Sequence, residues 1–243
     1  MSGEGVRRYL SQGFEQVPGW CHPRIMEITG LLADEMSAAG VIGGACEIGV
    51  YQGKFIIGLA HAVDGRPSLA IDLFDGQESN VDGSGGDIKR MLTGFRKNVE
   101  RFGYASLVDM AANSFALTIR DRIAILDRFG PFQLFSIDGG HTAEHVVNDY
   151  KFAEDVTHHG GAIIIDDINN AGWPGVMEGV AHVFFVQKPK FVPLLMGYNK
   201  LVLVGLTHHK RYLAGLETRI TADFPDQKIW HTKFFGYEML SVF

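Results

Sequence analysis

The stretch ACEIGVYQGKF (residues 45–55) joins a short apolar run to a helical pattern through a turn that contains Gly49 and Gly53. An apolar run, then glycines, then amphipathic sequence predicts a strand, a tight loop and a helix. In a doubly wound sheet, ligands bind outside the carboxyl ends of the strands where the strand order reverses, and the first strand-to-helix loop lies there. The stretch therefore predicts the start of an α/β fold and one wall of its ligand site.

Strand-like and helix-like segments alternate along the chain outward from this stretch. The strand-like runs are 43–50, 68–74, 105–110, 132–140, 161–167, 191–197 and 200–206, and the helix-like stretches are 54–63, 87–103, 115–130 and 144–156. Such alternation predicts parallel strands joined by right-handed crossovers, with helices on both faces. Only a short turn separates the last two runs, so we expect them to pair antiparallel at one edge. The expected fold is a doubly wound, mostly parallel, seven-stranded α/β sheet.

Length and composition favour one domain over two. The chain has 243 residues, 46% of them hydrophobic, which is enough for a full core. We expect a single domain over 1–243, with an N-terminal helical cap over 1–40, a cofactor-binding core over 41–206, and a C-terminal helix and tail over 207–243. The polar, glycine-rich stretch 76–87 is typical of a mobile loop, which would close over the site together with the N-terminal helices.

Charge and cysteine content narrow the partners and the compartment. A net charge of −6 leaves no basic excess for a phosphate backbone, so we expect a small-molecule partner and no nucleic acid. Two cysteines supply neither a disulfide framework nor a zinc quartet, which fits a reducing cytoplasm. The N-terminus has no apolar signal core, and no run approaches the roughly 18 apolar residues of a membrane span. We expect a cytoplasmic protein without membrane contact.

The residues around the glycine turn discriminate between ligand classes. A P-loop needs four residues between its glycines and Ser or Thr after the lysine, whereas this turn has three and then Phe55. The dinucleotide pattern Gly-x-Gly-x-x-Gly does not occur here either, and a purely structural tight turn remains open. Glu47 ends the strand with a carboxylate suited to a cationic group, and Asp72 ends the next strand, where an acid accepts from ribose hydroxyls. An adenosine-type ligand with a cationic amino-acid tail fits both acids.

Carboxylates also follow the fourth and fifth strands. Asp138 ends the fourth strand, and Asp166 and Asp167 end the fifth. Neighbouring strands lie about 4.8 Å apart, so these acids can share one ion, and a hard cation such as Mg²⁺, Mn²⁺ or Ca²⁺ suits oxygen ligands. Helix capping or solvation of the paired acids is the alternative. His141 follows Asp138, where an unperturbed imidazole has a pKa suited to accepting a proton at neutral pH.

Two other readings of the same residues stay open. HTAEH (141–145) matches the H-x-x-E-H zinc-peptidase pattern, which would make the chain a hydrolase. The chain could instead be a cofactor-binding protein that has lost catalysis and acts through association. Its aromatic tail KFFGYEMLSVF (233–243) can bury in a homo-oligomer interface, or it can form a last strand on its own sheet.

From residue 44 to about 205 the chain resembles class I S-adenosylmethionine-dependent methyltransferases. Within them it resembles metal-dependent O-methyltransferases of small molecules, related to macrolide-sugar and rhamnosyl methyltransferases and to cephalosporin-hydroxylase-like proteins. ACEIGVYQG resembles the first cofactor motif, AIDLF the ribose-binding acid, and AANS the segment before the adenine contact. IDGGHTAEHVVNDY followed by GGAIIIDDINNAGWPGV is the most specific part.

The resemblance implies methyl transfer from S-adenosylmethionine to a hydroxyl of a small molecule, such as a sugar or a natural product. The cofactor-binding residues it implies are Glu47, Gly49, Tyr51, Gly53, Asp72, Ser114 and Asp138. It also implies that Asp138, Asp166 and Asp167 hold Mg²⁺ and that His141 is the catalytic base. The chain departs from the family where Phe55 replaces Ser or Thr, where Gly140 replaces an acid, and at Ala143, near which the family has an aromatic residue.

Overall fold

The structure is a computed structural model that describes residues 2–83 and 90–243. Its α-helices are α1 (Ser2–Gln12), α2 (Pro23–Ala38), α3 (Lys54–Ala62), α4 (Met91–Phe102), α5 (Ile119–Phe129), α6 (Ala143–Val156), α7 (Pro174–His182) and α8 (His209–Asp223). Its strands are β1 (Ala45–Ile48), β2 (Ser68–Asp72), β3 (Leu107–Ala111), β4 (Phe132–Ile137), β5 (Thr157–Ile165), β6 (Phe191–Gly197), β7 (Lys200–Gly205), β8 (Ile229–Phe234) and β9 (Tyr237–Val242). Within the described residues no helix has both the length and the apolar character needed to cross a membrane.

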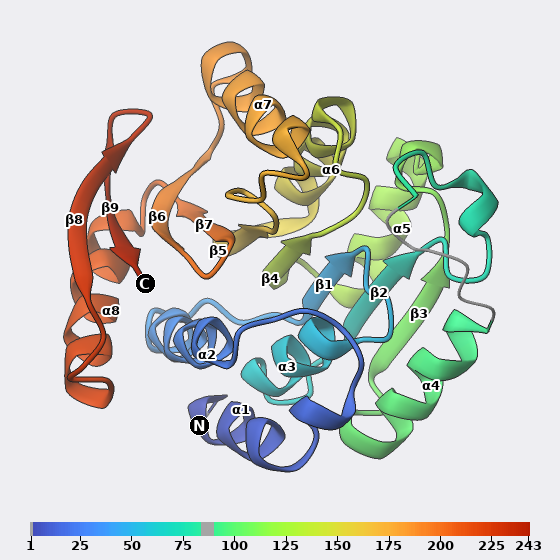
Figure 1. The fold of residues 1–243 in the computed structure, drawn as a ribbon, viewed down its shortest axis with the longest axis horizontal. Coiled ribbons are helices and arrows are strands. Elements are labelled where there is room, and N and C mark those ends of the chain that lie inside the picture. The colour runs from blue at the N-terminus through green and yellow to red at the C-terminus, as the bar shows by residue number, and fades with distance from the viewer. Residues whose placement is uncertain (1, 84–89) are drawn as a thin grey trace.

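These strands form one sheet with helices around it, which confirms the expected doubly wound α/β class (Figure 1). The described residues give the strand order β3-β2-β1-β4-β5-β7-β6-β9-β8, and β1 to β5 run parallel. In the described part of the chain the sheet has nine strands, whereas we expected seven from the sequence. The β6–β7 hairpin is antiparallel as expected, but β7 pairs with β5 and β9 continues the sheet beyond β6, so the hairpin is not at the edge.

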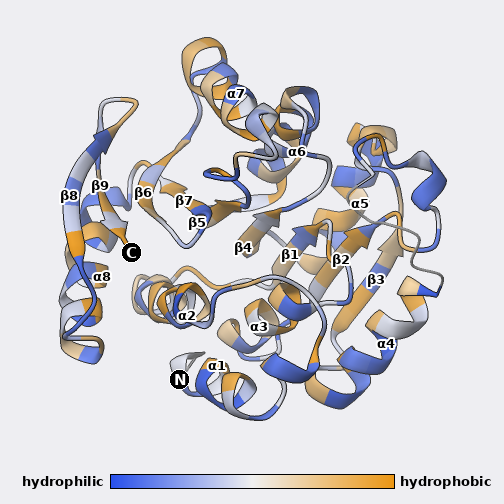
Figure 2. Ribbon diagram, in the orientation of Figure 1, coloured by the Kyte–Doolittle hydropathy of each residue, from blue (hydrophilic) through white to orange (hydrophobic). Residues whose placement is uncertain are grey.

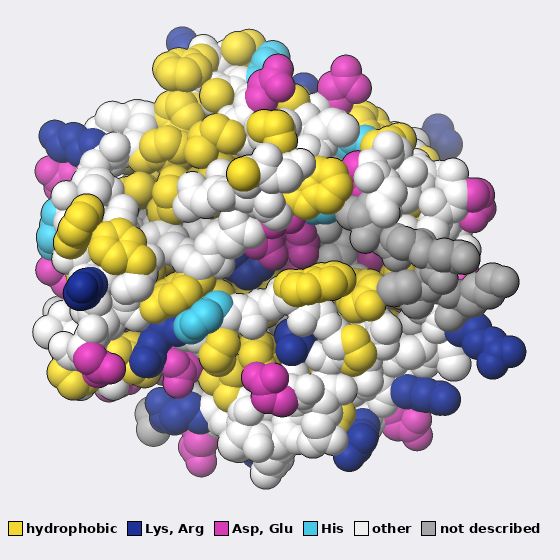
Figure 3. All heavy atoms as spheres, viewed as in Figure 1, with side chains coloured by type: hydrophobic (Ala, Val, Ile, Leu, Met, Phe, Trp, Pro, Cys, Tyr) yellow, Lys and Arg dark blue, Asp and Glu magenta, His cyan; other side chains and the backbone are white. Residues whose placement is uncertain are grey.

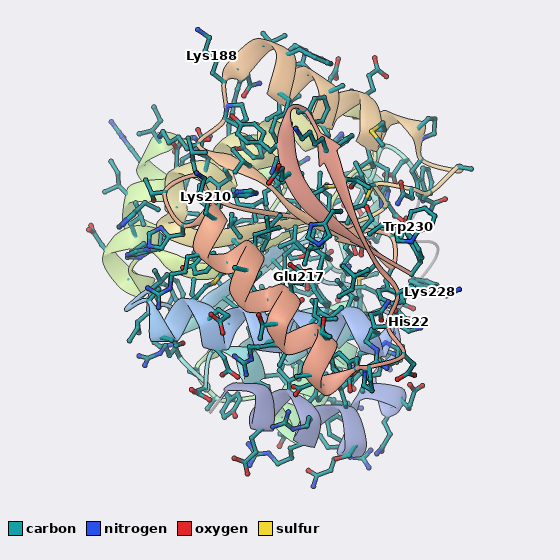
Figure 4. All side chains as sticks on the ribbon, turned by 90° about the vertical axis from the view of Figure 1, so that its left-hand side faces the viewer. His22, Lys188, Lys210, Glu217, Lys228 and Trp230 are labelled. Atoms are coloured by element: carbon teal, nitrogen blue, oxygen red, sulfur yellow. The ribbon has the colours of Figure 1, made fainter. Side chains whose placement is uncertain are left out.

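The two extra strands come from the C-terminal tail. Met239, Leu240 and Val242 are buried on β9, because this strand pairs with β6 and brings its apolar side chains into the core of the same chain. β8 then pairs antiparallel with β9 as the outer strand. Figure 4 shows α8, with Glu217 on it, lying beside this hairpin, which carries Trp230. The alternative of a tail strand on its own sheet is therefore the observed one.

Alternating side chains on each strand serve two separate cores. On β5, Ala162 and Ile164 join the core under α1, α2, α3 and α8, whereas Ile163 and Ile165 join the core under α6 and α7. Figure 2 shows the hydrophobic colour concentrated on the strands and on the helix surfaces that face them. Burial on both faces explains why these strands read as continuous apolar runs in the sequence.

The strand order reverses between β1 and β4, and their carboxyl ends are held level. The backbone N–H of Asp138 donates to Ile48 O at 2.8 Å, and that of Asp166 donates to Ile137 O at 3.0 Å. The residues that follow β1, β4 and β5 therefore project from the same edge of the sheet. In doubly wound folds this is the place where a ligand binds.

Candidate active site

A cavity of about 700 Å³ lies at the carboxyl ends of the parallel strands. Residues at the ends of β1, β2, β4 and β5 line it, together with segment 18–22 before α2 and residues 198–200 at the β6–β7 turn. Figure 3 shows acidic side chains gathered in the hollow at the centre of this face, bordered by hydrophobic ones. The cavity thus lies where the glycine turn and the strand-end acids predicted a ligand site.

Glu47, on β1, is the most deeply buried acid of this cavity. It is 1% exposed, and among the described residues its Oε2 has no hydrogen-bond partner. Burial raises the pKa of Glu47, and the nearby Asp138 raises it further, although Lys200 and Ser136 act against the shift. Because an unpaired buried carboxyl oxygen costs free energy, a positively charged donor on a ligand would satisfy it.

The two glycines of the turn have different roles. Gly49 lines the cavity with φ of +84°, and a Cβ there would overlap the backbone oxygen of Asp138. The absence of a side chain therefore lets β1 and β4 approach each other at the reversal point. Gly53, with φ of +94°, is the N-cap residue directly before α3 and is not among the lining residues in the described part of the chain. A Cβ added at Gly53 would lie 3.0 Å from the Phe95 ring, so the glycine lets this ring pack closely against the turn.

Asp72, Tyr51 and Ser114 line the side of the cavity next to β2 and β3. The Asp72 carboxylate accepts from the backbone N–H groups of Tyr51 at 2.9 Å and Phe74 at 2.7 Å, which holds it at the end of β2. Burial raises the pKa of Asp72, although these hydrogen bonds oppose the shift. Ser114 begins a short 3-10 helix after β3, and its neighbour Asn113 caps that helix.

Asp138, His141 and Asp167 form the acidic centre of the cavity. Each can offer one ligand atom, and these atoms lie within 4.8 Å of one another. Burial and the charge of Asp166 raise the pKa of Asp138. Burial also acts to raise the pKa of Asp167, but hydrogen bonds with His141 and two asparagines lower it overall. Two carboxylates and an imidazole at this spacing are a donor set that fits a divalent cation.

We also expected Asp166 in this group from the sequence, but its carboxylate accepts hydrogen bonds from other groups of the protein. One oxygen accepts from the buried Lys200 ammonium, and the other accepts from the backbone N–H of Asp167 at 2.9 Å. Lys200 comes from the start of β7 and is 1% exposed. Burial lowers the pKa of Lys200, but Asp166 outweighs this and the pKa is raised, so the lysine stays charged.

His141 lies between carboxylates. Its Nε2 is 3.1 Å from Asp167 Oδ2 and 3.7 Å from Asp138 Oδ1, while its Nδ1 is 2.8 Å from Asp82 Oδ2. Burial lowers the pKa of His141, but the three carboxylates raise it to about 10. The pKa of His141 therefore lies above the unperturbed value that we expected from the sequence. In the ligand-free protein the protonated ring supplies the positive charge between the acids. A divalent cation would replace that charge.

A comparison of this chain with known protein families agrees with the geometry of the site. A family described as a methyltransferase domain matches residues 46–168, just over half of the chain. The chain belongs to this family. The match confirms the resemblance to class I methyltransferases and the expectation that the protein is an enzyme. A comparison of this methyltransferase with curated proteins found no match.

Solved structures share its fold at low sequence identity. CalS11, a calicheamicin methyltransferase, has a TM-score of 0.57 and 13% identity, over 84% of this chain and 91% of that chain. The O-methyltransferase TomG from Streptomyces achromogenes, in complex with SAM, has a TM-score of 0.51 and 17% identity, over 84% of this chain and 87% of that chain. MycE, in complex with Mg and SAH, has a TM-score of 0.51 and 16% identity, over 84% of this chain and 54% of that chain.

The zinc-peptidase pattern HTAEH does not place its histidines on one helical face. α6 begins at Ala143, so His141 lies before the helix. His145 Nδ1 is 2.8 Å from Thr142 Oγ1, and the possible ion-binding group found in the described residues contains His141 but not His145. The pattern needs both histidines on a continuous helix, whereas Thr142 here caps the helix between them.

Four side chains that contact the candidate site residues of the methyltransferase were not predicted from the sequence: Asp82, Trp173, Asn199 and Lys200. Trp173 stacks on His141 with ring centroids 4.6 Å apart, and Asn199 donates to Asp167. Both central residues of the β6–β7 turn have positive φ, which suits a tight two-residue hairpin that points into the cavity. Of the four, only Lys200 left a signal in the sequence, as a lysine directly before a buried apolar run.

Proposed function

We propose that this methyltransferase transfers the methyl group of S-adenosylmethionine to a hydroxyl group of a small molecule, with the help of a divalent cation. The observation that carries the proposal is the closeness of two sites in one cavity. Glu47 offers a buried carboxyl oxygen that has no hydrogen-bond partner among the described residues, and the carboxylates of Asp138 and Asp167, with His141 beside them, are close enough to share one ion. The complexes of TomG with SAM and of MycE with Mg and SAH support this reading.

The cofactor would lie along β1 and β2. Glu47 would pair with the positively charged amino group of S-adenosylmethionine, and Asp72 would accept from the ribose hydroxyls. The remaining contacts would come from lining residues, namely Gly49, Tyr51, Ser114 and Asp138. Gly53 would act indirectly, because it shapes the start of α3. S-adenosylmethionine supplies an electrophilic methyl group on its sulfonium.

The acidic centre would serve the acceptor. We assign Asp138 and Asp167 to the cation, which is Mg²⁺ or otherwise Mn²⁺ or Ca²⁺, while Asp166 stays paired with Lys200. Such a cation lowers the pKa of a nearby hydroxyl when it is bound. His141, in its neutral form, would accept the hydroxyl proton at Nε2. Trp173 covers one face of the imidazole and keeps it in place.

The acceptor would enter past the N-terminal segment. Residues 18–22 line the cavity, and Trp20 is 81% exposed beside Tyr51, with ring centroids 5.5 Å apart. A rigid aromatic surface at the entrance suits a sugar or a natural product with a ring.

We also propose that residues 1–243 work as one domain, with 1–40 as the cap, 41–206 as the core and 207–243 as the C-terminal part. We further propose that the protein acts in the cytoplasm as a homo-oligomer.

The test combines binding and turnover. S-adenosylhomocysteine should bind in calorimetry, and a methyl-transfer assay over a panel of sugars and phenols should show turnover that EDTA removes and Mg²⁺ restores. Asp167→Ala should lose turnover and keep S-adenosylhomocysteine binding. Asp109→Ala is the control, because Asp109 pairs with Arg96 on the surface, away from the cavity. Absence of S-adenosylhomocysteine binding would overturn the cofactor assignment, and full turnover in EDTA would overturn the cation.

A further inference from the structure

Asp82 reaches the active site from the segment that follows β2. Its side chain is only 6% exposed, and Oδ2 accepts from the backbone N–H of His141 at 2.8 Å. The same oxygen lies 2.8 Å from Nδ1 of the His141 ring. A carboxylate is expensive to bury, so its double interaction with one residue indicates a defined place in the fold. Residues 84–87 of the predicted mobile loop lie outside the described residues.

The contact with Asp82 fixes which nitrogen of His141 faces the acids. Asp82 occupies Nδ1, and Nε2 points at Asp167 Oδ2 at 3.1 Å and Asp138 Oδ1 at 3.7 Å. Trp173 covers the ring face, with an interplanar angle of 17°. The two nitrogens of histidine are chemically distinct, and the hydrogen bond of one determines what the other can do. The imidazole is thus held at one edge and on one face.

We propose that Asp82 is a positioning residue for methyl transfer. Its contact with Nδ1 holds the ring so that Nε2 is directed at Asp138 and Asp167 on the acceptor side of the cavity. Without it the ring can rotate about its side-chain bonds and lose this direction. The segment that begins at Asp72, on the cofactor side, therefore continues to a residue that orients the proposed base. The catalytic consequence rests on the proposed function, whereas the orientation of the ring does not.

The experiment compares Asp82→Asn and Asp82→Ala with Glu78→Gln. Asparagine keeps an acceptor oxygen, and alanine removes it. Glu78 belongs to the same segment, is exposed and does not line the cavity, so its variant removes an equal charge without touching His141. Histidine-labelled protein, with the signal of His141 assigned through His141→Gln, gives the exchange rate and position of the Nδ1 proton by NMR. Turnover and S-adenosylhomocysteine affinity are measured on the same samples.

We expect the slowly exchanging Nδ1 proton of His141 to persist in Glu78→Gln and to be lost in Asp82→Ala. Turnover should fall about 10-fold in Asp82→Asn and about 100-fold in Asp82→Ala, the range typical of residues that orient a functional histidine, with partial rescue by asparagine. Affinity for S-adenosylhomocysteine should stay within about twofold, since Asp82 is expected to act on turnover and not on cofactor binding.

Three results would overturn the inference: an unchanged Nδ1 proton in Asp82→Ala, an equal loss of turnover in Glu78→Gln, or a loss of S-adenosylhomocysteine affinity as large as the loss of turnover. The last two would show a general effect on the segment. A wild-type protein that transfers no methyl group would contradict the proposed function instead, and the NMR comparison would still decide whether Asp82 orients His141.

Discussion

The ammonium group of Lys200 is buried against the carboxylate of Asp166, with side-chain exposures of 2% and 11%. The Lys200 Nζ also lies 4.2 Å from the centroid of the Phe55 ring, so an aromatic face packs against this cation. The pair neutralises one acid of the cluster. It leaves Asp138 and Asp167 as the carboxylates available to an ion.

Removing one partner of this buried pair should destabilise the protein strongly. In Lys200→Met the Asp166 carboxylate loses its counter-charge, and we expect the free energy of unfolding to fall by about 3–5 kcal/mol. The double variant Lys200→Met, Asp166→Asn should recover more than half of that loss, since no buried charge is left unpaired. Urea denaturation of the single and double variants measures both values. Additive losses would show that the two groups do not depend on each other.

His141→Gln should separate proton transfer from cation binding. We expect turnover to fall by about 10²–10⁴-fold, because a glutamine cannot accept the acceptor's proton. Mn²⁺ affinity, measured by electron paramagnetic resonance, should change little, because Asp138 and Asp167 keep their oxygens. If Mn²⁺ affinity instead falls as far as it does in Asp167→Ala, His141 is a metal ligand and the proton must leave by another group.

Glu47→Gln should weaken ligand binding and strengthen the fold. The glutamine is neutral, so the contact with a cationic amino group is lost, and S-adenosylhomocysteine affinity should fall by about 10–100-fold. The ligand-free protein should become more stable at neutral pH, because a buried carboxylate oxygen that lacks a partner among the described residues disappears. Calorimetry and thermal unfolding test the two opposite effects. Equal stability of both proteins would mean that Glu47 has a partner in solution.

The stability difference between Glu47→Gln and the wild-type protein should depend on pH with a definite sign. Burial raises the pKa of Glu47 in the folded protein above its ordinary value in the unfolded chain, so the folded state holds this proton more tightly than the unfolded state. The contribution of Glu47 to stability therefore declines as the pH rises above that value. We expect the stability advantage of Glu47→Gln to be small near pH 4 and to grow toward neutral pH. An advantage independent of pH would contradict this assignment.

Gly49→Ala and Gly40→Ala form a matched pair. Both glycines have positive φ, +84° and +78°, so alanine costs backbone strain at each position. No atom of the described residues lies within 4 Å of a Cβ at Gly40, whereas a Cβ at Gly49 would overlap the Asp138 backbone. Gly40→Ala should lose about 1–2 kcal/mol of stability, and Gly49→Ala clearly more, together with S-adenosylhomocysteine binding. Similar losses in thermal unfolding would remove the argument from close packing.

Short-range features of the chain were readable without a structure. The periodic apolar runs predict β1 to β5 and the helices between them, and Gly49 and the strand-end acids identify the ligand-binding edge of the sheet. Each of these depends on the conformational preferences and burial of neighbouring residues, which leave a local pattern. The position of the tail (233–243) could not be predicted in the same way, because its alternating residues indicate a buried face but do not indicate which surface covers it.

Side-chain partners are set by contacts between distant parts of the chain. Nothing near Asp166 in the sequence distinguishes it from Asp167, yet only Asp166 meets Lys200, which the β6–β7 hairpin delivers. Likewise, nothing in the sequence around His141 indicates that it pairs with Asp82, whose segment reaches it across the end of the sheet. Local patterns establish which residues arrive at the edge of the sheet. The packing of loops and hairpins there establishes which charge each one faces, and with it the chemistry of the site.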